Sequence, residues 1–145
     1  MSSISKRYLV EVPEREVAPE IRARARSALV RSAAALRLEG AKLAWFREEN
    51  EAEELERLEL ERAGRTADRI RLEGVPLGFV LRGKAWIRAD IPLDEVVVTV
   101  AHEVAHLYQR KRCPALGWKR TAPPELDGWA EEDAEAFGRW MEANW

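Results

Sequence analysis

The stretch Val96–Tyr108 reads VVVTVAHEVAHLY, and its structure decides the fold. The first three valines alone would suit a buried strand, because β-branched residues favour strands. The apolar run is too long for a typical strand, however, and this length favours a buried helix. Pro92 and Asp94 precede the run and are typical of a helix start, while Cys113-Pro114 ends it. The sequence therefore predicts a buried helix that begins near Val96 and ends near residue 112.

The only two histidines of the chain lie inside this predicted helix, in the segment His102-Glu103-Val104-Ala105-His106. Residues four apart lie on one face of a helix, so both imidazoles can reach one zinc ion at about 2.0–2.1 Å. Glu103 follows the first histidine and projects toward the water that such a metal activates. The spacing therefore predicts His102 and His106 as metal ligands and Glu103 as general base. Without a metal, burying these polar groups in an apolar helix would be costly.

A catalytic zinc site needs a third protein ligand, and the composition of the chain restricts the choice. No further histidine exists, and the single cysteine, Cys113, lies at the predicted helix end. One cysteine also excludes a disulfide framework and a four-cysteine zinc ribbon. The third ligand should therefore be a carboxylate, and the last predicted helix, over 126–143, offers Glu131, Glu132, Asp133 and Glu135.

The positions of these carboxylates around the predicted helix indicate which of them is best placed to be the third ligand. Glu131 shares one side of the helix with the small residues Ala134 and Gly138, which would let this helix approach the histidine helix closely. Asp133 borders the same apolar side and is the alternative ligand. Glu132 points away, whereas Glu135, one turn after Glu131, could bond a ligand imidazole.

The rest of the chain predicts one mixed domain over residues 1–145. Strands are predicted over 8–12, 43–46, 70–72, 77–81 and 84–89, and a tight turn at Arg82-Gly83 joins the last two. Pro19 begins a long amphipathic helix, for which Gly40 is a plausible stop. Glu48–Glu61 contains eight Glu and allows a short, solvated helix. We expect an α+β fold with a small twisted sheet, mixed or mostly antiparallel, on which the first helix and the histidine helix pack.

Charge and composition exclude several classes of function. The 24 Lys+Arg residues nearly balance the 26 Asp+Glu residues, so nothing draws the chain as a whole to nucleic acid, and we expect no such binding. The sequence has neither a membrane span nor the apolar core of a signal peptide, and we expect a cytoplasmic protein. Dense Glu and Arg with few amide residues fit a thermophile or a GC-rich genome.

Two segments of the sequence resemble a known group of enzymes. The segment HEVAH on a buried helix, followed by Glu131-Glu132-Asp133-Ala134-Glu135-Ala136-Phe137, is similar to small gluzincin-type zinc metallopeptidases, and nearest to the ImmA/IrrE-like peptidases. The resemblance covers about residues 70–141. It implies a zincin-like fold in which His102, His106 and Glu131 hold Zn²⁺. It also implies that a strand at the sheet edge, expected at 84–89, binds the substrate backbone by strand addition.

The expected activity is hydrolysis of a peptide bond in a peptide or protein substrate, with Glu103 as general base and then as proton donor to the leaving amine. The residue that steadies the oxyanion has no clear counterpart, and Tyr8, Tyr108 and Arg88 are candidates. The alternative is a metal-binding structural or regulatory module of phage or mobile-element type on a zincin scaffold, without turnover. The oligomeric state is left open.

Overall fold

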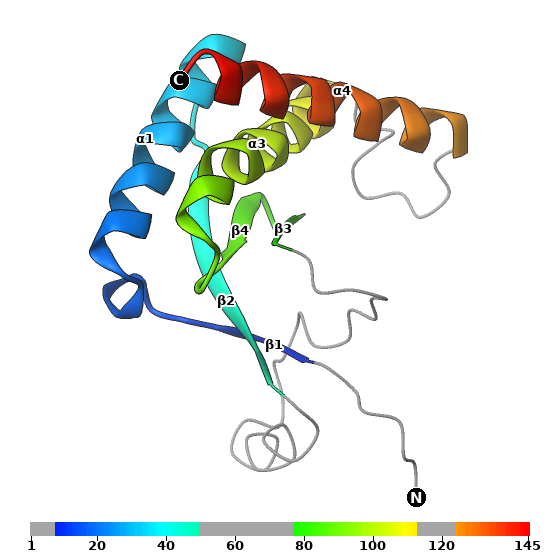
Figure 1. Cartoon of the computed structure of the whole chain (residues 1–145). Coiled ribbons are helices and arrows are strands. Elements are labelled where there is room, and N and C mark those ends of the chain that lie inside the picture. The colour runs from blue at the N-terminus through cyan, green and yellow to red at the C-terminus, as the bar shows by residue number, and fades with distance from the viewer. Residues whose placement is uncertain (1–7, 50–76, 113–123) are drawn as a thin grey trace, which may run out of the picture.

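The computed structural model describes residues 8–49, 77–112 and 124–145. Within these ranges the fold is mixed α+β, with helices packed on one face of a four-stranded sheet (Figure 1). The strands are β1 (Tyr8–Glu11), β2 (Lys42–Glu49), β3 (Gly78–Leu81) and β4 (Lys84–Arg88). The helices are α1 (Pro19–Leu36), α3 (Val96–Arg112) and α4 (Pro124–Ala143), with short 3₁₀ turns at Glu14–Glu16 and Leu93–Glu95.

The sheet has the order β1-β2-β4-β3 and is mixed, as predicted. β2 and β4 run parallel, whereas the pairs β1 with β2 and β3 with β4 are antiparallel. Arg82 and Gly83 both have positive φ, of 55° and 76°, as a two-residue hairpin turn between β3 and β4 requires. The hairpin predicted at this turn is therefore confirmed.

The expectation that residues 84–89 form the edge of the sheet is wrong. β4 lies between β2 and β3, and β3 is the edge strand on this side of the sheet. The register explains the difference, because β4 pairs with β3 through the hairpin on one side and with β2 on the other. Ala85 and Ile87 of β4 are completely buried, which suits an internal strand.

Two other boundaries differ from the sequence prediction. Glu48 and Glu49 end β2 instead of beginning an acidic helix, because they pair with Leu9 and Tyr8 of β1. Residues 50–61 of that predicted helix, and the strand predicted at 70–72, lie outside the described residues. α1 ends before Gly40, because Arg37 already adopts the left-handed conformation that closes a helix.

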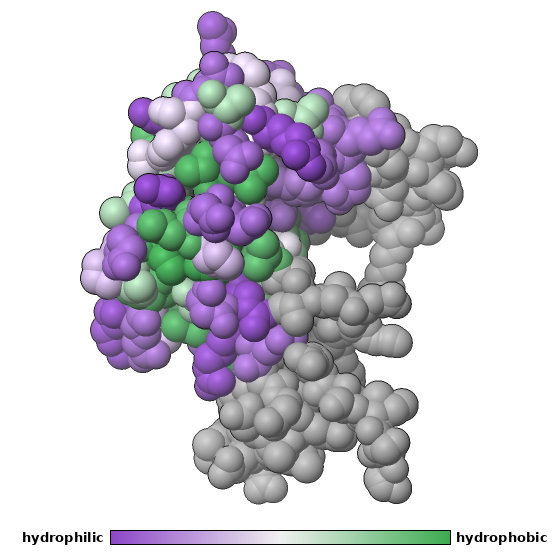
Figure 2. Space-filling model, viewed as in Figure 1, coloured by the Kyte–Doolittle hydropathy of each residue, from purple (hydrophilic) through white to green (hydrophobic). Residues whose placement is uncertain are grey.

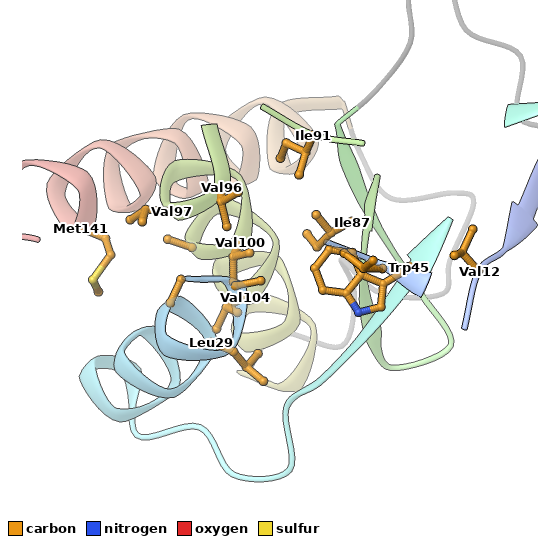
Figure 3. Close-up of a cluster of buried hydrophobic side chains, with 14 residues drawn as sticks. Val12, Leu29, Trp45, Ile87, Ile91, Val96, Val97, Val100, Val104 and Met141 are labelled. Carbon is orange, nitrogen blue, oxygen red and sulfur yellow. The ribbon is translucent and has the colours of Figure 1, made fainter. Parts of the chain in front are cut away.

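The main hydrophobic core lies where α1 and α3 meet the sheet. Trp45 and Ile87 project from the sheet toward Val100 and Val104 of α3 (Figure 3). Leu29 of α1 lies next to Val104 and belongs to the same cluster. Figure 2 shows hydrophobic residues gathered near the junction of α1 and α3, with hydrophilic residues around them. Among the described residues, no helix combines the length and the apolar character needed to cross a membrane.

α3 and α4 approach each other closely at Gly138. A Cβ atom added there would lie 2.9 Å from the backbone oxygen of Val98 and 3.6 Å from Cβ of His102. One turn earlier, Ala134 is completely buried. The small residues predicted for this side of the last helix therefore lie where the two helices pack.

This packing gives a first prediction. Gly138→Ala should lower the free energy of unfolding by about 1–3 kcal/mol, because the added methyl group meets backbone that cannot move away. The measurement is chemical denaturation. The control is Ala136→Gly, at an exposed position of α4. It should lower the free energy of unfolding by about 0.5–1 kcal/mol through helix propensity alone. Stabilisation by Gly138→Ala would show that the close approach does not matter.

Candidate metal centre

Three side chains from α3 and α4 meet at one point. His102 and His106 lie one turn apart on α3, and their Nε2 atoms are 3.2 Å apart. Glu131 of α4 reaches both rings, with Oε1 3.2 Å from Nε2 of His102 and Oε2 3.1 Å from Nε2 of His106. The two histidines are largely buried, whereas Glu131 is exposed. The structure thus brings together the three residues that the sequence singled out as ligands.

The size of this group fits a metal ion. A tetrahedral zinc with ligand bonds of about 2.0–2.1 Å holds neighbouring ligand atoms about 3.3 Å apart. The contacts that join the two nitrogens and the carboxylate measure 3.1–3.2 Å. Imidazole nitrogen and carboxylate oxygen are donors that zinc and related transition metals accept. His102, His106 and Glu131 can therefore hold such an ion.

Glu103 lies beside these ligands but is not one of them. Its side chain is almost completely buried, at 7% exposure. Burial raises the pKa of its carboxyl group to about 8, and the negative charge of Glu131 adds to this effect, while Arg110 opposes it. Burial also lowers the pKa of His102, and the neighbouring His106 contributes. Desolvation thus disfavours the charged form of both side chains.

Gln109 connects His106 to α4. Its Oε1 lies 2.9 Å from Nδ1 of His106, and its Nε2 donates to the backbone oxygen of Ala130 and to Oδ2 of Asp133, both at 2.9 Å. Gln109 is only 3% exposed. A second layer of hydrogen bonds therefore lies directly behind one of the two imidazoles.

The site opens into a cavity of about 360 Å³. One wall is the edge strand β3, through Gly78, Phe79 and Val80, and the other walls carry His102, Glu103, His106, Gln109, Arg110, Ala130 and Glu131. A second hollow of about 510 Å³ shares Gly78, His102 and Glu103 with the first. Glu95, Glu135, Arg139 and Glu142 line this second hollow. The two hollows therefore meet at the candidate site, next to β3.

Two carboxylates that the sequence offered as ligand or ligand partner have other contacts. Asp133, the alternative ligand, accepts a hydrogen bond from Gln109 and is not part of the donor group. Glu135 pairs with Arg139 at 2.7 Å, since the two lie one turn apart on α4. It affects His102 only through its charge, so the expected bond to an imidazole is absent among the interactions of the described residues.

Two of the expected oxyanion residues, Tyr108 and Arg88, line neither hollow. The ring of Tyr108 lies under the guanidinium of Arg112, and Arg88 is paired with Glu48 and Asp90. Sequence reasoning missed Arg110, which does line the cavity beside Glu103.

Gln109 was missed as well, although the sequence held a signal for it. It is the only glutamine in the chain, and it follows His106 by three residues in a helix. Side chains three apart lie on neighbouring positions of a helix face, so a contact could have been foreseen.

Comparison of the chain with protein-family models, with curated proteins and with solved structures finds no match.

The burial of Glu103 gives a second prediction. A carboxyl group whose pKa is raised in the folded state keeps its proton there while the unfolded chain loses it. Stability therefore falls as the pH rises from about 4.5 to about 8. Glu103→Gln removes this loss and should stabilise the metal-free protein by roughly 2–4 kcal/mol at pH 8, but little at pH 4.5.

The measurement is the melting temperature of variant and wild type in chelator at both pH values. Glu132→Gln, at an exposed position of α4, serves as control and should change neither. An equal gain at both pH values for Glu103→Gln would contradict the account.

Proposed function

We propose that the chain is a zinc-dependent metallopeptidase with a zincin-like fold. The observation that carries this proposal is the position of a buried carboxylate, Glu103, next to a donor group of His102, His106 and Glu131. A cavity bordered by β3, the edge strand of the described sheet, adjoins both. The residues present suit zinc, since two imidazoles and one carboxylate leave a coordination position free for water or substrate.

A zinc ion at this site would lower the pKa of a water molecule toward ~7 and polarise the carbonyl group of a substrate. Glu103 lines the cavity in which that carbonyl would lie. Ionised beside a cation held by His102, His106 and Glu131, its carboxylate would accept a proton from the attacking water and then donate it to the leaving amine. His102, His106 and Glu131 have a different role, which is to hold the metal.

The substrate class follows from the edge strand. β3 pairs with β4 along one side, and among the described strands nothing pairs with its other side. An extended peptide can add to such an edge through backbone hydrogen bonds. Since Gly78, Phe79 and Val80 line the cavity, a peptide bound there would place its backbone beside Glu103. β3 thus replaces β4 as the proposed substrate strand.

Arg110 is the proposed stabiliser of the oxyanion. Of the described residues that line the cavity, it is the one that carries a permanent positive charge. Its charge also acts on Glu103, which places it near the atoms that react. Neither Tyr108 nor Arg88 lines the cavity, so Arg110 takes the role first considered for them.

The alternative, a metal-binding module without turnover, needs only the three ligands. It gives no reason to bury Glu103, which does not belong to the donor group and costs free energy in its charged form. Buried groups with a strongly shifted pKa gather in active sites. The burial of Glu103 therefore favours the peptidase over the module without turnover.

Metal content tests the first half of the proposal. The wild-type chain, without an affinity tag, should bind about one zinc per chain, and His106→Ala should lose it because only two donors remain. Metal mass spectrometry of purified protein measures both. Equally negligible zinc in the two proteins, even after zinc is supplied, would contradict the proposal.

Cleavage tests the second half. Zinc-loaded wild type should cleave members of a peptide library, and Glu103→Gln should bind zinc equally well but cleave at least about 100-fold more slowly. Glu132→Gln is the matched control and should keep full activity. Zinc binding without any cleavage that depends on Glu103 would favour the module without turnover.

A further inference from the structure

We infer that Gln109 is a positioning residue that fixes the tautomer of His106 and thereby presents a free nitrogen lone pair to the metal. The inference rests on the proposed function as far as the metal is concerned. It begins from a buried side chain, Gln109, that touches both helices of the site at the same time.

The orientation of the Gln109 amide is determined by its partners. Its Nε2 lies 2.9 Å from two atoms that can only accept hydrogen bonds, the backbone oxygen of Ala130 and a carboxylate oxygen of Asp133. An amide nitrogen has two hydrogens to donate, so both bonds are satisfied. The opposite orientation would place the amide oxygen against two other oxygens. Oε1 must therefore be the atom that faces His106.

This orientation decides where His106 carries its proton. An amide oxygen only accepts, so Nδ1 of His106 must donate across the 2.9 Å contact. In the neutral ring the other nitrogen, Nε2, then has no hydrogen. Nε2 is the atom that faces His102 and Glu131. Gln109 thus leaves the lone pair of His106 aimed at the centre of the donor group.

The contact between His106 and Glu131 shows why this matters. A nitrogen lone pair lies 3.1 Å from a carboxylate oxygen, and two acceptors at this distance repel each other. A cation between them turns the repulsion into attraction. With Gln109 in place, the neutral site favours a bound metal ion over a direct bond from His106 to Glu131.

Asp133 and Ala130 extend this control to α4. Both belong to α4, close to Glu131 in sequence. The amide that orients His106 therefore also holds the part of α4 that carries the third ligand. One side chain therefore aligns donors from two helices, and such supporting residues typically change metal affinity 10–100-fold when they are replaced.

The tautomer can be observed directly. Nitrogen-15 NMR of the full chain in chelator, at a pH at which the ring of His106 carries one proton, should show that proton on Nδ1. Gln109→Met keeps the shape of the side chain but loses the acceptor, and should yield a mixture of tautomers. Lys111→Met, at an exposed position on the same helix, is the control and should leave the Nδ1–H form unchanged. An unchanged tautomer in Gln109→Met would overturn the inference.

Zinc affinity supplies the second measurement, by competition with a chromophoric chelator. Gln109→Met should weaken zinc binding 10–100-fold. Gln109→Glu should also weaken it, because a carboxylate would face the oxygens of Ala130 and Asp133. Adding Asp133→Asn to Gln109→Glu should restore part of the affinity, since the new amide at position 133 can donate a hydrogen bond to the new carboxylate at position 109. Equal affinity in Gln109→Met and wild type would overturn the inference.

Two further outcomes keep the tests separate. If Gln109→Met does not fold, Asp133→Ala takes its place, because Asp133 is exposed and its loss removes one of the two anchors of the amide. Zinc affinity should then fall several-fold, and an unchanged affinity would count against the inference. If no variant binds zinc but the tautomer still depends on Gln109, the proposed function fails and the role of Gln109 in orienting His106 is supported.

Discussion

The contact of the Glu131 carboxylate with two imidazoles is the interaction on which the site depends. Glu131 is far from the histidines in sequence, and it reaches both rings only because α4 lies directly on α3. Gly138 and Ala134 make that approach possible, since a side chain at position 138 would meet the backbone at Val98. The ligand geometry is therefore a consequence of helix packing, and any change that separates the helices also separates the donors.

α3 contributes to the core and to the site through different faces. Val96, Val100 and Val104 are fully buried and pack toward α1 and the sheet (Figure 3). His102 and His106 lie on the face toward α4, where the cavity opens. Placing polar groups at the edge of a buried helix costs free energy, because they lose water. The apolar contacts of the other face offset this cost, so one rigid helix supports both the fold and the chemistry.

The sequence predicted most of what lies on α3, because an apolar run with two histidines four residues apart restricts both the structure and the chemistry. It also predicted that Glu131 shares a side with Ala134, since helical periodicity alone determines this. Strand order could not be predicted in the same way. Residues 84–89 were expected at the edge because a strand followed by the histidine helix resembles the zincin arrangement, but pairing with β2 depends on contacts between distant segments. Its spacing from His106 was a signal for Gln109, but the bonds of Gln109 to Ala130 and Asp133 could not be foreseen, since these residues lie on another helix.

The central claim is that His102, His106 and Glu131 bind one metal ion together. Anomalous diffraction at the zinc absorption edge, from crystals of the wild-type chain grown with zinc, tests it most directly. One strong peak is expected about 2.0–2.2 Å from Nε2 of each histidine and from a carboxylate oxygen of Glu131. A well-ordered site without such a peak, or a zinc bound only by other residues, would contradict it.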